Sequence, residues 1–102
     1  MEAGDERQDV LDQTRRIAVE ALSLYPVKIY LFGSWAKGTA SRSSDIDLAI
    51  DSKVPLPPAA LSTLRERLEE STLPWRVEVV DLRNAPSSFR EKVLREGILW
   101  KD

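Results

Sequence analysis

The stretch Gly33-Ser34-Trp35-Ala36-Lys37-Gly38, followed five residues later by Ser44-Asp45-Ile46-Asp47-Leu48, carries most of the information about the fold. Before it, residues 27–32 form a β-branched and aromatic run, which predicts a buried strand. Ser34 is a favourable N-cap for a short helix, and Gly38 is suited to end that helix. Residues 45–50 alternate between polar and apolar, which predicts a second strand with one buried face.

Two acidic residues on that second strand indicate a metal site. Asp45 and Asp47 are two positions apart, so in a strand their side chains leave the same face. Carboxylates this close repel each other, and a divalent cation that both can ligate relieves the repulsion. For an isolated pair, a solvated strand face is the better interpretation. Gly33 and Ser34 shift the balance, because a strand that turns into a helix at Gly-Ser presents backbone N–H groups to an anion such as phosphate.

The composition limits the chemistry that this site can perform. The chain of 102 residues contains no cysteine and no histidine. Thiolate or imidazole metal ligands, cysteine nucleophiles and histidine bases are therefore excluded, and the metal must be a hard ion such as Mg²⁺, Mn²⁺ or Ca²⁺. The net charge of −2 argues against a nonspecific nucleic-acid binder. The length predicts one domain over residues 1–102.

The rest of the chain predicts alternating helices and strands. Helices are expected over residues 5–24, closed by Pro26, from the prolines at 57–58 to about 71, and from a capping box at Ser88 to Gly97. Strands are expected over residues 75–80 and 98–100, which gives an α/β fold. The residues expected to face the core from the helices are Val10, Thr14, Ile17, Ala18, Ala21, Leu22, Leu61, Leu64, Leu68, Phe89, Val93 and Leu94.

The glycine-serine element and the spacing of Asp45 and Asp47 resemble the DNA polymerase β-like nucleotidyltransferases, and in particular the minimal nucleotidyltransferases. The resemblance implies a mixed sheet flanked by helices. It also implies a catalytic and metal-binding set of Asp45, Asp47 and a third acid. Strand alternation gives the third position to Glu78, where the family usually has Asp, and leaves Asp81 as a turn residue at the strand end.

The same resemblance implies a substrate, a cofactor and a partner. ATP would bind with two Mg²⁺ ions, and its phosphates would contact Gly33, Ser34, Lys37 and Ser44, although Ser44 also suits the turn before Asp45. Minimal nucleotidyltransferases commonly accompany a helical HEPN toxin, an RNase that they silence by adding AMP to a tyrosine. We therefore expect an antitoxin. The acidic, polar N-terminus and the short apolar runs lead us to expect a cytoplasmic protein with no membrane contact, and the net charge leads us to expect no direct nucleic-acid contact. Self-association is left open.

Two alternatives to AMP transfer onto a toxin remain at this stage. In the first, Glu78 has weakened catalysis and the protein acts only by binding its partner. In the second, the nucleotide is transferred to a small molecule, although no substrate domain is visible. The roles of the tryptophans also have alternatives. Trp35 is expected either to stack on a base or dock a partner, or simply to pack. Trp75 and Trp100 are expected in the core or at an interface.

Overall fold

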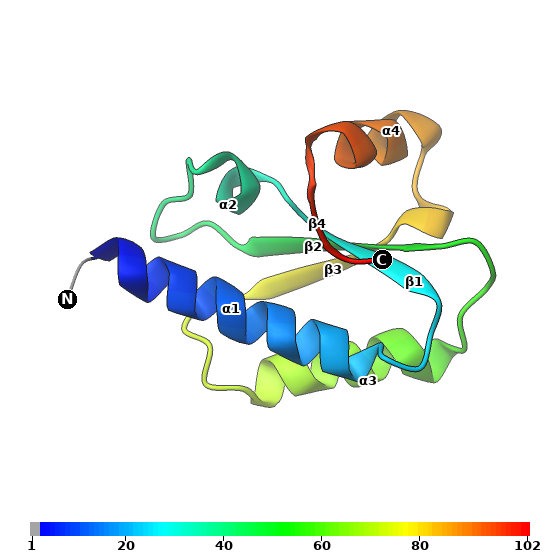
Figure 1. Cartoon of the computed structure of the whole chain (residues 1–102), viewed down its shortest axis with the longest axis horizontal. Helices are drawn as coiled ribbons and strands as arrows, with labels where there is room; N and C mark the ends of the chain where they lie inside the picture. Colours follow the sequence, from blue (N-terminus) through cyan, green and yellow to red (C-terminus); the bar gives the residue numbers. More distant parts are fainter. Residues whose placement is uncertain (1–2) are drawn as a thin grey trace.

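Four strands form one sheet in the order β3-β2-β1-β4. The computed structural model describes residues 3–102, with side chains from residue 6 onward (Figure 1). Strand β1 (Val27–Phe32) pairs antiparallel with β2 (Ile46–Ser52) and with β4 (Ile98–Lys101), whereas β2 pairs parallel with β3 (Val77–Asp81). The sheet is therefore mixed, and the predicted α/β class is confirmed.

Helices cover the two faces of this sheet unequally. Helices α1 (Ala3–Ala21) and α3 (Pro58–Glu70) lie together on one face, and α4 (Ser87–Glu96) lies on the other (Figure 1). The α1/α3 face contains the larger core, in which Ile46, Leu48 and Ile50 are fully buried. A smaller cluster around Tyr30, Ala49 and Val93 lies under α4. The even-numbered residues of β2 therefore face the main core, as the alternation predicted.

The apolar stripe of each helix explains why it packs where it does. Val10, Thr14, Ala18 and Leu22 are buried along α1 and the turn after it, and Leu61, Leu64 and Leu68 are buried along α3, as predicted. Leu94 does not follow the prediction, because its side chain is 37% exposed at the outer side of α4. The α4 stripe is narrow, consisting of buried Val93 and half-buried Phe89.

Three predicted helix boundaries differ from the structure. Helix α1 ends at Ala21, because residues 22–25 form a turn in which the Tyr25 N–H donates to the Leu22 carbonyl (3.0 Å) before Pro26. The N-cap of α2 (Ser34–Lys37) is Gly33 and not Ser34. The N-cap of α4 is Pro86, so the predicted cap Ser88 lies inside the helix. In both helices the start is set by backbone geometry, and no side chain caps it.

The predicted C-terminal ends of α2 and α4, which glycines were expected to set, agree with the structure. Gly38 closes α2 in the left-handed conformation (φ 76°), and Gly97 follows α4, where its N–H donates to the Val93 carbonyl. Strand β3 passes directly into a short 3₁₀ helix, η1 (Leu82–Asn84).

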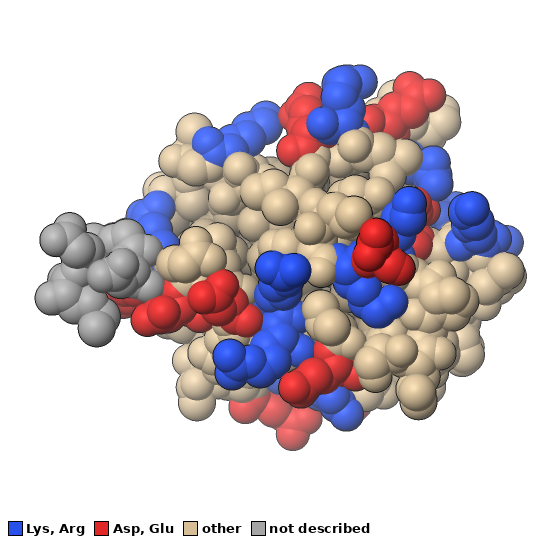
Figure 2. All heavy atoms as spheres, viewed as in Figure 1, with Lys and Arg blue, Asp and Glu red and all other residues tan. Residues whose placement is uncertain are grey.

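None of the helices in residues 3–102 combines the length and apolar character that crossing a membrane requires. On the face that carries α1, acidic and basic side chains are intermingled (Figure 2).

The main core predicts a large difference between two leucines. Leu64 on α3 is fully buried, whereas Leu24 is 92% exposed. We expect Leu64→Ala to lower the free energy of unfolding by about 2–5 kcal/mol, because the substitution leaves a cavity. Leu24→Ala is the matched control and should change it by less than about 0.5 kcal/mol. Urea denaturation measures both, and similar losses for the two variants would contradict this packing.

Candidate active site

The acidic residues meet at one end of the sheet. Strand β1 ends there at Phe32, and the antiparallel β2 begins there, so that Phe32 lies opposite Asp47. Because β3 runs parallel to β2, its first residues are at the same end, and Glu78 lies directly beside Asp47. Asp45 is the residue immediately before β2, not part of it. The topology therefore brings Asp45, Asp47 and Glu78 together from two strands.

Gly33 is required by the space that Asp47 occupies. Its backbone has φ 76° and ψ −157°, a region that residues with a side chain rarely adopt. A Cβ atom on Gly33 would collide with Asp47 Oδ2 and would lie 3.3 Å from Asp47 Cγ. The chain can therefore turn from β1 into α2 directly over this carboxylate only through a glycine. This places the start of α2 against the acidic residues.

The three acids influence one another electrostatically. The pKa of Asp47 is raised, first by partial burial of its carboxyl group and then by the negative charges of Asp45 and Glu78. A protein keeps carboxylates in such repulsion at a cost, and a bound cation removes the cost. The arrangement therefore has the electrostatic character of a cation site.

Oxygen donors of this kind fit Mg²⁺, which prefers carboxylates and water. Asp45 and Asp47 are the residues that would hold it. Glu78 is turned to a different partner, since its Oε1 is 2.8 Å from Nη2 of Arg76, with the two side chains 44% and 73% exposed. Within the part of the chain that the structure describes, no three acidic side chains already converge as a ligand set. Glu78 would have to exchange Arg76 for a cation to join the other two.

The predicted phosphate contacts surround the start of α2. Gly33 and Ser34 are half-buried there, and the Lys37 ammonium is exposed, 3.5 Å from the carboxylate of Glu96 on α4. The Ser44 hydroxyl accepts a hydrogen bond from the Ser41 N–H (2.9 Å), so the turn role expected for Ser44 is present.

A small hollow adjoins Gly33 between α2 and α4. Its volume is about 170 Å³, and its floor is apolar, because Phe32 and Phe89 pack edge-to-face with ring centroids 5.6 Å apart. Lys92 of α4 adds a second ammonium group beside Lys37. Sequence analysis missed Lys92 and Phe89 as site neighbours, because only the pairing of β4 with β1 brings α4 over this end of the sheet.

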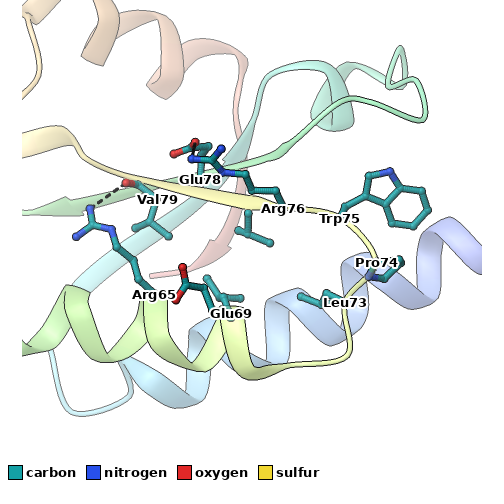
Figure 3. A pocket seen from close by; sticks show the side chains of 10 residues that line it. Arg65, Glu69, Leu73, Pro74, Trp75, Arg76, Glu78 and Val79 are labelled. Carbon is teal, nitrogen blue, oxygen red and sulfur yellow. Dashed lines mark hydrogen bonds and ion pairs between the residues drawn. The ribbon is translucent and has the colours of Figure 1, made fainter.

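A larger hollow of about 360 Å³ lies at the free edge of β3, between that strand and α3 (Figure 3). Arg65 reaches across from α3 and donates to the Val79 carbonyl (3.0 Å). Glu78 and Arg76 lie on the other side of the strand, where they turn towards each other (Figure 3). The larger hollow is therefore mainly on the α3 side of the sheet, away from the Asp47 carboxylate.

Asp81 has the structural role that strand alternation predicted. It ends β3 and caps η1, accepting hydrogen bonds from the Arg83 N–H (3.0 Å) and the Asn84 side-chain amide (3.2 Å). Its carboxylate is thereby occupied at the far end of β3 from Glu78.

Trp35 is packed in the protein and is not available to stack on a base or dock a partner. Its side chain is 6% exposed, and its indole N–H donates to the Ser44 carbonyl (3.1 Å).

Comparisons with known proteins point to one family. The polymerase beta nucleotidyltransferase family model matches residues 18–101. The MntA protein of Haemophilus influenzae is 46% identical over 74 residues (72% of this chain), and protein adenylyltransferase MntA of Shewanella oneidensis is 41% identical over 73 residues (71%). The chain spans 65% and 52% of the lengths of these two relatives.

Two solved structures share the fold. One is a toxin–antitoxin with AMP-PNP (32% identity, TM-score 0.68, covering 84% of this chain and 71% of that one). The other is a tri-AMPylated Shewanella oneidensis HEPN toxin in complex with MNT antitoxin (27% identity, TM-score 0.61, covering 87% of this chain and 70% of that one).

A side chain at Gly33 would meet two obstacles, whereas one at Gly38 would meet one. Both glycines have φ 76°, but Gly38 is left-handed (ψ 17°) and a Cβ there would have no atom within 4 Å. We expect Gly38→Ala to cost about 1–2 kcal/mol of unfolding free energy through strain alone. Gly33→Ala should cost clearly more, because ψ −157° is a region that only glycine adopts readily and because the new side chain also displaces Asp47. Equal losses in chemical denaturation would contradict both the Gly33 conformation and its contact with Asp47.

The raised pKa of Asp47 predicts how stability depends on pH. A carboxyl group with a higher pKa in the folded state binds protons more tightly there, so stability falls as pH rises from the unfolded pKa, about 3.9, through the folded pKa. Asp47→Asn removes this loss. In metal-free buffer, we expect the variant to gain stability relative to wild type as pH rises from 3 to 7. A wild-type advantage that grows over the same range would contradict the assignment.

Proposed function

The chain belongs to the polymerase-β nucleotidyltransferase family, and we propose that it is a Mg²⁺-dependent antitoxin that transfers AMP from ATP to a tyrosine of a HEPN toxin. The observation that carries the proposal is the contact between Gly33 and Asp47. It sets a turn suited to phosphate directly against a carboxylate that Asp45 and Glu78 already repel. A polyphosphate bound with divalent cations satisfies both halves of such a site.

Each residue of the site then has a role in the transfer. Asp45 and Asp47 would hold Mg²⁺, and the bound ion would supply positive charge to the phosphates. Gly33 and Ser34 bind the β- and γ-phosphates, helped by Lys37 and by Ser44 at the loop end. The acceptor hydroxyl oxygen forms the new bond to the α-phosphorus, and the bond to pyrophosphate breaks. Glu78 completes the metal set and accepts the hydroxyl proton.

The acceptor is proposed from the relatives. The tri-AMPylated HEPN toxin in complex with MNT antitoxin supports a HEPN toxin as the partner and AMP as the transferred group. The names of the two MntA relatives support adenylyl transfer to a protein. The AMP-PNP complex supports ATP as the donor. A tyrosine hydroxyl is a suitable acceptor, because a carboxylate base beside the metal pair could take its proton.

A second candidate follows from the ion pair between Glu78 and Arg76 (2.8 Å). If Arg76 keeps Glu78 away from Asp47 when ATP is bound, the site lacks its third acid. The protein would then neutralise its partner by binding alone. The two candidates make opposite predictions for labelled nucleotide.

The experiment uses ATP labelled at the α-phosphate and, as the acceptor, the Shewanella oneidensis HEPN toxin, with and without Mg²⁺. We expect label on the toxin only when Mg²⁺ is present, and mass spectrometry should place it on tyrosine. Toxin neutralised without label would support the binding-only candidate. If a small molecule is added and only that molecule becomes labelled, the result would support nucleotidyl transfer to a small molecule.

Variants of the acids test the roles within the site. Asp47→Asn should lower AMP transfer at least about a hundredfold, the scale for a lost preorganised charge. Glu78→Ala should abolish transfer, and Glu78→Asp should raise it by restoring the usual reach to the metal. Asp81→Asn is the control, because asparagine can still cap η1 and Asp81 lies outside the site. Loss of transfer in Asp81→Asn with Glu78→Ala active would assign the third acid to Asp81.

A further inference from the structure

The loop between α2 and β2 carries Ser44 and Asp45, and three side chains hold it, two of them from distant parts of the chain and one from α2. Each of them donates a hydrogen bond to a loop carbonyl. Arg7 Nη1 of α1 bonds to Ala40 O (2.9 Å), Trp75 Nε1 to Arg42 O (3.0 Å) and Trp35 Nε1 of α2 to Ser44 O (3.1 Å). Every second carbonyl of the loop is therefore bound by a side chain.

The three donors are also packed on one another. The Trp35 and Trp75 rings meet edge-to-face, with centroids 5.2 Å apart and an interplanar angle of 77°. The Arg7 guanidinium lies over the Trp35 ring, with Cζ 5.6 Å from its centroid. Edge-to-face aromatic contacts and cation–π contacts are both favourable, so the three side chains support one another. We call Arg7, Trp35 and Trp75 the loop clamp.

We infer that the loop clamp is a positioning device for the nucleotide and metal site. This inference rests on the proposed function. The other hydrogen bonds of the loop are local: Ser41, Ser43 and Ser44 bond to one another, and residues 41–43 are exposed. A loop that is free to move would have to be ordered each time MgATP binds. The clamp orders it beforehand, so that Ser44 and Asp45 are already in place.

Conservative variants separate the clamp from general stability. Trp75→Phe keeps an aromatic edge against Trp35 but loses the N–H that binds Arg42 O. Trp75 is only half-buried, so the variant should fold. Trp35→Phe loses the bond to Ser44 O in the same way. Trp100→Phe is the matched control, because Trp100 is a half-buried tryptophan on β4 at the opposite edge of the sheet.

Limited trypsin digestion gives a readout that needs no ligand. Arg42 is an exposed cleavage site within the loop, and its carbonyl is the one that Trp75 holds. We expect cleavage after Arg42 to be about three- to tenfold faster in Trp75→Phe, the scale of one neutral hydrogen bond. Trp100→Phe should be cut at the wild-type rate. An unchanged rate in folded Trp75→Phe would overturn the clamp as a restraint on the loop.

AMP transfer then tests the link to the site. In Trp75→Phe and Trp35→Phe, we expect the KM for MgATP to rise about three- to tenfold with kcat within about twofold of wild type. Lower thermal stability with an unchanged KM would show a merely structural role and overturn the inference. If wild type neither binds nor uses ATP, the proposed function fails, while faster digestion of Trp75→Phe would still establish that the clamp restrains the loop.

Discussion

The position of one carboxylate constrains most of this structure. Asp47 Oδ2 occupies the volume that a side chain on Gly33 would need, so the turn out of β1 must be glycine in a positive-φ conformation. The pairing of Phe32 with Asp47 fixes which residue of β2 meets that turn. A shift of this pairing by one residue would move Leu48 under the turn and place Asp47 in the main core. Strand register, helix start and acidic site therefore depend on the same contact.

The pairing of strands in the mixed sheet brings further acidic residues to the Gly33–Asp47 contact. Antiparallel pairing brings the end of β1 to the beginning of β2, and parallel pairing brings the beginning of β3 to the same place. Glu78 therefore lies beside Asp47 although many residues separate them along the chain. The pKa of Asp47 is raised first by partial burial and then by the charges of Asp45 and Glu78, and that repulsion is a consequence of topology. It is sustained because the fully buried Ile46 and Leu48 anchor β2 on both sides of Asp47.

Sequence patterns predicted the features that depend on local geometry. The bounds of β1 follow from its β-branched and aromatic run, the inward face of β2 follows from alternation, and the end of α4 follows from Gly97. The caps at Ser34 and Ser88 were wrong, because the chain direction at each helix start is set by Gly33 and Pro86. The bonds of Trp35 and Trp75 to loop carbonyls could not be predicted, since they depend on how α2 and the start of β3 approach one loop in three dimensions.

The length of the Glu78 side chain has a physical consequence that the ion pair with Arg76 makes visible. Residues 76 and 78 lie on the same face of the chain, and the longer side chain of Glu78 reaches the guanidinium. Both side chains are largely exposed, and ion pairs of this kind contribute only about 0–1 kcal/mol. A divalent cation beside Asp47 attracts a carboxylate far more strongly, because it also relieves the repulsion among three acids. The pair is thus weak enough that a cation could compete with Arg76 for Glu78, which is what the proposed function requires.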